Sequence, residues 1–204
     1  MLKANIAVLV SGGGTNLQAL IDSEAKGIIK NGEIKVVISN VKDAYALVRA
    51  EKAGIDTFTV LKKECSSQED FEEKITKILE DNDIDLIVLA GFMSILSEKF
   101  TTRFKDRIIN VHPSLIPSFC GKGFYGLHVH EAALSYGVKV TGATVHFVNE
   151  IPDGGKIIMQ KAVEILDGDT PEVLQKRVME QAEWIILPES VEKVSREIAK
   201  GKEK

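Results

Sequence analysis

The stretch "VLVSGGGTNLQAL", residues 8–20, joins an apolar strand pattern to a helical pattern through three consecutive glycines. In an open parallel sheet, a turn of this kind lies at the carboxyl ends of the strands, where ligands bind. The stretch therefore predicts the first strand and the first helix of an α/β domain, with a ligand crevice beside the glycines.

The glycine turn has the chemistry of an anion site. Glycines let backbone N–H groups face an anion, Thr15 adds a hydroxyl donor, Asn16 adds an amide donor, and the helix N-terminus adds partial positive charge. The turn lacks the Gly-Lys-Ser/Thr ending of a nucleotide P-loop, and Leu17 stands where the dinucleotide fingerprint has its third glycine. Phosphate fits the turn, but a tight strand-to-helix connection without a ligand stays open.

The rest of the chain repeats the alternation of short apolar runs with helical segments. Strands are expected near residues 5–10, 33–39, 55–60, 84–91 and 107–112, and helices near residues 16–27, 44–54, 66–82, 97–104 and 129–137. "SSQE" opens the third helix as a capping box, with Ser66 as the cap and Glu69 three residues on. This order predicts a Rossmann-like, open, mostly parallel and twisted sheet with helices on both faces.

The C-terminal part departs from that alternation. Residues 139–150 and 154–165 are two apolar strand patterns around a glycine turn, which predicts a hairpin. Residues 170–201 predict a long terminal helix, with a proline in its first turn and an interruption at Pro188.

Composition bounds the class of protein. A chain of 204 residues that is 44% hydrophobic can bury the core of one domain, 1–204. A net charge of -4 gives no basic surface for nucleic acid. No apolar run has the length of a membrane span, and "MLKANIAVLV" leads into a strand rather than a cleavable signal, so a cytoplasmic protein is expected. Cys65 and Cys120 make neither a disulfide framework nor a metal quartet.

Asn110 and His112 alternate at the end of the fifth expected strand, so both side chains should lie on one face near the glycine turn. An amide donor beside an imidazole suits acyl transfer, because the amide can hold a carbonyl oxygen while the histidine moves protons. Asp153, in "NEIPDGGK", is the best-placed carboxylate to orient the imidazole. Ser114 lacks the small-residue elbow of a catalytic serine, so the nucleophile should come from a substrate. A structural histidine and a plain Asp-Gly-Gly turn remain alternatives.

The other histidines are expected to have lesser roles. His146 lies in an alternating strand pattern and should be supporting or buried. His128 and His130 form a His-x-His pair of the kind found in metal-dependent hydrolases, but the pair follows a glycine-rich stretch and enters a helix. No further ligands have suitable spacing, so no metal is expected and the pair should only shape the cleft.

With the glycine turn, "LAGFMSIL", "INVHPSLIPSF" and "HFVNEIPDGGKII" in this order, the sequence resembles the folate-dependent phosphoribosylglycinamide formyltransferase family over essentially the whole chain. The resemblance implies transfer of the formyl group of 10-formyltetrahydrofolate, as co-substrate, to the amine of glycinamide ribonucleotide in purine biosynthesis. It also implies a phosphate- and nucleotide-binding half, 1–105, and a catalytic and folate-binding half, 106–204. Monomer and homodimer both stay open.

The resemblance assigns roles to individual residues. Asn110 would hold the formyl oxygen, His112 would be a proton donor or oxyanion partner, and Asp153 would keep that histidine charged and relay the amine proton. The ribonucleotide would contact Gly14, Thr15 and Asn16 through its phosphate and Glu183 near its ribose. The folate would contact Gln68, Met93, Ser94, Ile95, Leu96, Asn110, Asn149, Glu150 and Ile151. For Ile95 and Leu96 taken alone, a core position is the simpler interpretation.

Three features depart from the family pattern. Relatives often carry a cation where Ser94 and Gln68 stand, which puts contacts to the glutamate tail of folate in doubt. Trp184 takes a position that is commonly histidine. The loop 118–126 is longer than in many relatives, and it could be either a lid over the cleft or an exposed loop without a role.

Four other functions share part of the pattern. A formyltetrahydrofolate deformylase would have an added N-terminal regulatory domain, whereas the first strand begins here by residue 5. A methionyl-tRNA formyltransferase would have a basic C-terminal domain, whereas this chain is acidic. A non-catalytic ribonucleotide-binding module would leave Asn110, His112 and Asp153 without a joint purpose. A metal-dependent hydrolase would need further ligands.

Overall fold

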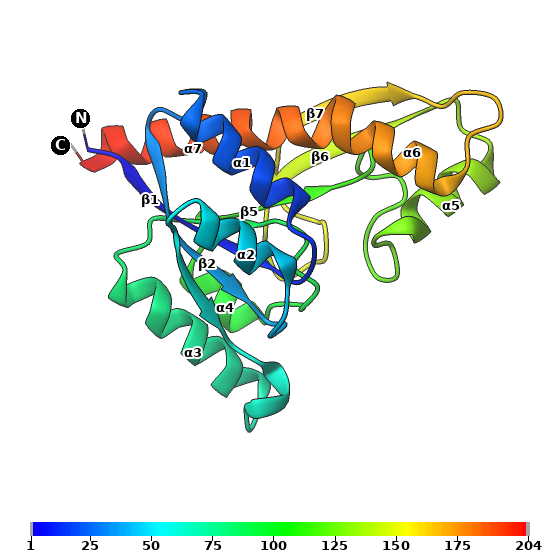
Figure 1. The fold of residues 1–204 in the computed structure, drawn as a ribbon. Coiled ribbons are helices and arrows are strands. Elements are labelled where there is room, and N and C mark those ends of the chain that lie inside the picture. The colour runs from blue at the N-terminus through cyan, green and yellow to red at the C-terminus, as the bar shows by residue number, and fades with distance from the viewer. Residues whose placement is uncertain (1, 203–204) are drawn as a thin grey trace.

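One mixed sheet runs through the chain in the order β3-β2-β1-β4-β5-β6-β7 (Figure 1). The computed structural model describes residues 2–202. Its strands are β1 (Ala4–Val10), β2 (Gly32–Ser39), β3 (Asp56–Thr59), β4 (Leu86–Leu89), β5 (Ile108–His112), β6 (Val140–Phe147) and β7 (Ile157–Glu164). Neighbours from β3 to β5 are parallel, whereas β6 is antiparallel to both β5 and β7. The predicted mostly parallel sheet and the predicted hairpin are confirmed.

Helices cover both faces of the sheet, each over its own apolar core. They are α1 (Thr15–Ala25), α2 (Tyr45–Lys52), α3 (Gln68–Asp81), α4 (Glu98–Arg103), α5 (Leu127–Tyr136), α6 (Pro171–Val178) and α7 (Trp184–Lys202), with a short 3-10 turn at Lys62–Glu64. Helices α1, α2 and α7 lie on one face, and α3 and α4 on the other (Figure 1). Along β1, Ile6 and Val8 join the first core while Ala7 and Leu9 join the second, because successive strand side chains point to opposite faces.

Helix α3 is capped one residue later than the capping box predicts. The side chain of Ser67, not Ser66, accepts the hydrogen bond, from the backbone N–H of Asp70 at 3.1 Å. Asp70 in turn accepts from the N–H of Ser66 at 2.8 Å, while Glu69 forms an ion pair with Lys99. Two adjacent serines each have an acid three residues on, so the pattern alone cannot choose between them.

The terminal helix is interrupted before Pro188 rather than at it. Helix α6 passes into a π-helical turn, Met179–Glu183, and α7 then continues through Pro188. A proline ring crowds the carbonyl four residues earlier, which here belongs to Trp184. The wider π turn ends beside that residue, and the helix continues past the ring.

The strand order reverses between β1 and β4, and this reversal locates the ligand crevice. From β1 the chain builds outward through β2 and β3, then returns to the other side of β1 with β4 and β5. The connections that leave β1 and β4 therefore diverge at the carboxyl edge of the sheet, which is where open α/β sheets bind ligands. The glycine turn follows β1 at this edge.

Strand β6 depends on a glycine in its interior. A Cβ at Gly142 would fall against the backbone carbonyl of Lys161 on β7. We expect Gly142→Ala to lower the free energy of unfolding by about 1–3 kcal/mol, the usual effect of overpacking. Urea denaturation measures this loss. Gly201→Ala in α7, where an added methyl meets nothing within 4 Å, is the control and should not destabilise. A Gly142→Ala protein as stable as the wild type would contradict this packing.

Candidate active site

Four polar side chains meet at the carboxyl end of β5. Asn110 and His112 are alternate residues of that strand, and His146 on β6 is paired with Asn110. Asp153, from the turn between β6 and β7, lies 3.6 Å from Nδ1 of His112 and 3.6 Å from Nε2 of His146. Nδ2 of Asn110 lies 3.3 Å from Nε2 of His146. The structure thus brings the three predicted catalytic residues together and adds a fourth.

These groups open into a cavity of about 720 Å³. Asn110, His112 and Asp153 line it together with residues 91–95, which follow β4, and residues 121–126 of the long loop. A smaller pocket of about 130 Å³ adjoins the cavity and shares four of its predicted residues. The smaller pocket is lined by Leu89, Phe92, Ser94, Ile95, Leu96, Asn110, His146 and residues 148–153, which include Asn149, Glu150 and Ile151.

The carboxylate of Asp153 is mostly enclosed, with 14% of its side chain exposed. Burial alone would raise the pKa of Asp153, but contact with His146, the charge of His112 and the N–H of Gly121 at 2.8 Å together hold it below its usual range. Asp153 is therefore ionised. Its backbone is left-handed, with φ of 56°, and Gly155 passes so close to β6 that no Cβ fits there.

His112 has a lowered pKa. Burial is the main cause, and it outweighs the opposing effects of Asp153 and of the Phe119 carbonyl. Nε2 of His112 lies 2.8 Å from that carbonyl, which can only accept a hydrogen bond, so we assign the hydrogen to Nε2. Nδ1 then carries the free lone pair and faces Asp153. Burial thus opposes the charged form of His112, while Asp153 favours it, as the resemblance implies.

His146 supports the site from the neighbouring strand. It is buried, as expected, and its Nδ1 lies 2.8 Å from the carbonyl of Phe147. That contact fixes the ring so that Nε2 faces both Asn110 and Asp153. The strand pattern predicts the burial of His146 but gives no signal for its contact with the other two groups.

His128 and His130 lie in different environments. His130 is fully buried, and neither ring nitrogen has a hydrogen-bond partner among residues 2–202. Burial lowers the pKa of His130 to about 4. His128 is exposed and lies 3.0 Å from Glu131. Within residues 2–202, no group of three or more His, Cys, Asp or Glu side chains is placed to hold a metal ion.

The glycine turn is joined to the π turn that precedes α7. The Nδ2 of Asn16 donates to Oε2 of Glu183 at 2.7 Å, and the hydroxyl of Thr15 lies 3.8 Å from the sulfur of Met179. Burial raises the pKa of Glu183, with the amide of Asn16 acting in the opposite direction. The predicted ribonucleotide residues, with Gly14 directly before them, are thus gathered at one place. Thr15 lines a separate cavity of about 290 Å³ together with Gln18, Arg49 and Trp184.

The segment after β4 presents apolar side chains to solvent. Met93 is 56% exposed and Ile95 is 70% exposed, whereas Leu96 is 8% exposed and belongs to the second core. The interpretation as a core residue is therefore right for Leu96 and wrong for Ile95. Gln68 donates to the carbonyl of Ile95 at 3.2 Å, so it holds the backbone of this segment.

The loop 118–126 is part of the cleft and not an exposed ornament. The carbonyl of Phe119 faces His112, and the N–H of Gly121 donates to Asp153. Residues 121–126 form one wall of the main cavity. The loop therefore contributes to the burial that sets the pKa of His112.

Sequence reasoning does not single out Ser11 and Asn40, which link the two ends of the site. The hydroxyl of Ser11 donates to Oδ1 of Asn40 at 2.6 Å and accepts from the N–H of Met93 at 2.8 Å. Nδ2 of Asn40 donates to the hydroxyl of Ser94 at 2.8 Å. Each of the two residues directly follows a buried strand at the ligand edge, and that position is the only signal in the sequence.

Comparisons with known proteins give one consistent result. A family profile described as formyl transferase matches residues 4–191. The chain belongs to the formyl transferase family. It is 45% identical to the phosphoribosylglycinamide formyltransferase of Haemophilus influenzae, over 90% of this chain and 83% of that protein.

Longer relatives and solved structures agree with this family. The chain is 44% identical to the trifunctional purine biosynthetic protein adenosine-3 of Gallus gallus, over 95% of its own length but 18% of the length of that relative. The crystal structure of glycinamide ribonucleotide transformylase 1 from Symbiobacterium toebii matches this formyltransferase with a TM-score of 0.88 and 42% identity. That match covers 98% of this chain and 89% of the other.

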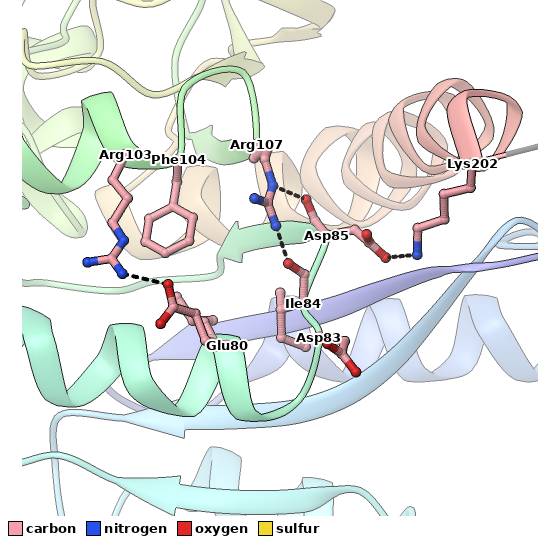
Figure 2. Close-up of a pocket in the computed structure, with 9 residues that line it drawn as sticks. Glu80, Asp83, Ile84, Asp85, Arg103, Phe104, Arg107 and Lys202 are labelled. Atoms are coloured by element: carbon pink, nitrogen blue, oxygen red, sulfur yellow. Dashed lines mark hydrogen bonds and ion pairs between the residues drawn. The ribbon is translucent and has the colours of Figure 1, made fainter. Parts of the chain in front are cut away.

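A second large cavity of this formyltransferase, about 620 Å³, lies near the amino ends of β4 and β5 (Figure 2). Its three cationic side chains all have partners within the protein. Arg103 pairs with Glu80, Lys202 pairs with Asp85, and Arg107 donates to backbone carbonyls ahead of β4. Because these charges are already paired, the cavity has less to offer a ligand than the carboxyl edge has.

The buried His130 should make the stability of this formyltransferase depend on pH. The unfolded chain takes up a proton near the ordinary pKa of 6.5, whereas the fold keeps His130 neutral down to about 4. The contribution is complete above pH 6.5 and is lost as the pH falls toward 4, with a slope of at most about 1.4 kcal/mol per pH unit. We expect His130→Leu to show a shallower loss in urea denaturation between pH 7 and 5.

His128→Gln is the matched control, because it removes the other histidine of the same helix, whose side chain is exposed. Its pH dependence should equal that of the wild type. Identical slopes in the wild type and in His130→Leu would show that His130 is not held neutral by the fold.

Proposed function

We propose that this chain transfers the formyl group of 10-formyltetrahydrofolate to the amine of glycinamide ribonucleotide, a step of purine biosynthesis. The observation that carries the proposal is the meeting of an amide, an imidazole and an ionised carboxylate, Asn110, His112 and Asp153, in a cavity beside a narrow pocket. The match to named phosphoribosylglycinamide formyltransferases supports the same reaction.

The three side chains suit an acyl transfer between two nitrogens. The lone pair of the ribonucleotide amine forms a bond to the formyl carbon, and the carbonyl electrons move to the oxygen. The amide of Asn110 donates to that oxyanion. The intermediate collapses when the bond to N10 of the folate breaks, and N10 takes a proton. No protein nucleophile and no metal is needed.

The proton passes through the pair formed by His112 and Asp153. Nε2 of His112 is engaged by the Phe119 carbonyl, which supports Nδ1 as the atom that accepts the proton. Asp153 stabilises the imidazolium that forms. The amine proton therefore reaches the pair, directly or through water, and returns to N10.

The two substrates have separate subsites. The phosphate of the ribonucleotide binds at Gly14, Thr15 and Asn16, and Glu183 lies near the ribose; the contact between Asn16 and Glu183 supports this grouping. The folate heterocycle enters the smaller pocket, where Asn149, Glu150 and Ile151 supply backbone groups and Ile95 supplies exposed apolar surface. Met93 adds exposed apolar surface in the adjoining main cavity. Each subsite draws on both halves of the chain, because Glu183 of 106–204 joins the ribonucleotide subsite and Met93 and Ile95 of 1–105 join the folate subsite.

The proposal also covers the location and the partners of the enzyme. Among residues 2–202, no helix has the length and the apolar character needed to cross a bilayer. The partners of the family are small molecules. We place the enzyme in the cytoplasm, as a monomer or a homodimer, without nucleic acid.

One assay separates the candidate reactions. The purified protein is incubated with 10-formyltetrahydrofolate and glycinamide ribonucleotide, with water alone as the control acceptor. Formylated ribonucleotide should appear only when the amine is present. Release of formate at the same rate with water alone would indicate a deformylase, and binding without turnover would indicate a non-catalytic module.

Asn110 should act mainly on turnover. We expect Asn110→Ala to lower kcat by about 10² to 10³, the usual loss for an oxyanion donor, with a much smaller change in KM for the ribonucleotide. Steady-state kinetics measures both constants. Asn82→Ala at the end of α3, the same change away from the cleft, is the control. Near-normal kcat in Asn110→Ala would remove this side chain from the mechanism.

Replacement of Asn40 should affect mainly the KM for 10-formyltetrahydrofolate. Its carboxamide joins Ser11 to Ser94 and so holds the segment that carries Met93 and Ile95 against the cleft. Loss of two hydrogen bonds of about 0.5–1.5 kcal/mol each predicts a roughly tenfold rise in KM for 10-formyltetrahydrofolate in Asn40→Ala. Steady-state kinetics with the folate varied measures it. An unchanged KM for folate would show that the segment does not need this link.

A further inference from the structure

The phosphate subsite of the proposed function contains no cation among its assigned residues. Gly14, Thr15 and Asn16 offer neutral donors, and Glu183 adds an acid beside them. A phosphate monoester carries between one and two negative charges at neutral pH, and hydrogen bonds to it strengthen when the donor side is charged. A cationic side chain beside the turn would therefore add to the partial positive charge of the helix N-terminus.

Helix α2 holds the glycine turn at three points. The backbone N–H of Ala46 donates to the carbonyl of Gly12 at 3.1 Å, and Nε of Arg49 donates to the carbonyl of Gly13 at 2.8 Å. Gly14, with φ of 72°, lies so close to Ala46 that a Cβ would stand 2.6 Å from the Cβ of that residue. Both carbonyls of the turn are thus directed at α2.

The direction of the carbonyls fixes the direction of the amides. In a trans peptide the C=O and the following N–H point opposite ways, so the N–H groups of Gly13 and Gly14 point away from α2. The carbonyl of Gly14 accepts from Gln18 inside α1, so the N–H of Thr15 points away from the helix. These three N–H groups donate to no acceptor within residues 2–202. Successive free N–H groups around a left-handed residue form an anion-binding concavity.

The guanidinium of Arg49 is fixed and its charge is not neutralised. Besides its bond to Gly13, it donates to the side-chain carbonyl of Gln18 at 3.0 Å and stacks over the ring of Tyr45 at 5.0 Å. It takes part in no ion pair within residues 2–202. It lines the same cavity of about 290 Å³ as Thr15.

We propose that Arg49 is the positioning residue of the phosphate subsite. Its hydrogen bond to the Gly13 carbonyl turns the amides of the turn toward the anion, and its charge attracts the phosphate of the ribonucleotide. The planar, branched guanidinium donates to the carbonyl of Gly13 and to the side chain of Gln18 at the same time. The single ammonium group of a lysine cannot reproduce this pair of hydrogen bonds. This inference rests on the proposed function, because it deepens the ribonucleotide site.

The test compares Arg49→Met and Arg49→Lys with the wild type. We expect Arg49→Met to raise KM for glycinamide ribonucleotide and Kd for inorganic phosphate by about 10- to 100-fold, with a much smaller effect on kcat and on KM for folate. Arg49→Lys should recover only part of the loss, because it restores the charge without the double hydrogen bond. Steady-state kinetics gives the constants, and calorimetric titration with inorganic phosphate gives Kd.

Arg103→Met is the matched control, because it removes the same charge at the opposite cavity (Figure 2) and should change neither KM. The proposal would be overturned if Arg49→Met raised KM for glycinamide ribonucleotide and KM for folate equally, or if it left the Kd for phosphate unchanged. Full recovery of both constants in Arg49→Lys would overturn it as well. If thermal unfolding shows that Arg49→Met does not fold, Arg49→Lys alone decides between a partial loss and none.

Thr15→Ala separates this inference from the proposed function on which it rests. A weaker phosphate affinity in Thr15→Ala together with wild-type affinity in both Arg49 variants would keep the subsite and reject the role of Arg49. Unchanged phosphate affinity in all three variants would mean that the glycine turn is not the phosphate site, and the proposal would fall with it.

Discussion

The buried carboxylate of Asp153 is the group on which the arrangement of the cleft depends. Removing a charge from water costs several kcal/mol unless hydrogen bonds and opposite charges offset it. Here the N–H of Gly121 on the long loop donates to the carboxylate at 2.8 Å, and the imidazoles of His112 on β5 and His146 on β6 each lie 3.6 Å from it. One side chain thus ties three segments to one point. The carboxylate also places a negative charge beside His112, which would stabilise an imidazolium.

The pKa directions of the pair match the chemistry proposed for it. The pKa of His112 is lowered by burial, and the pKa of Asp153 is lowered by its partners, so at neutral pH both groups are free of the exchangeable proton. The site is therefore ready to receive a proton rather than to give one. Formyl transfer between two nitrogens needs this order, because the attacking amine loses a proton before the leaving nitrogen gains one.

Patterns of polarity predicted the fold and part of the site. Apolar runs too short for helices, separated by helical segments, suffice for a parallel sheet, and period two suffices to place Asn110 and His112 on one face. The same pattern says only that His146 is buried, because its contact with Asn110 depends on the register between β5 and β6. The protonation state of His112 depends on its contact with the loop 118–126, which leaves no periodic signal in the sequence. The π turn ahead of Pro188 has no signature in hydrophobic periodicity either.

The polar groups at the two edges of the sheet differ in whether they have partners within the protein. At the amino edge, ion pairs and carbonyl contacts satisfy the charges of Arg103, Arg107 and Lys202 within the protein (Figure 2). At the carboxyl edge, α2, the π turn and the link through Ser11 hold the glycine turn in place, while its outward amides have no acceptor within residues 2–202. Polar groups that are held rigidly but left without a partner bind a ligand at little cost in reorganisation. The contacts that fix the glycine turn come from its own carbonyls and side chains, and this leaves its amides to the substrate.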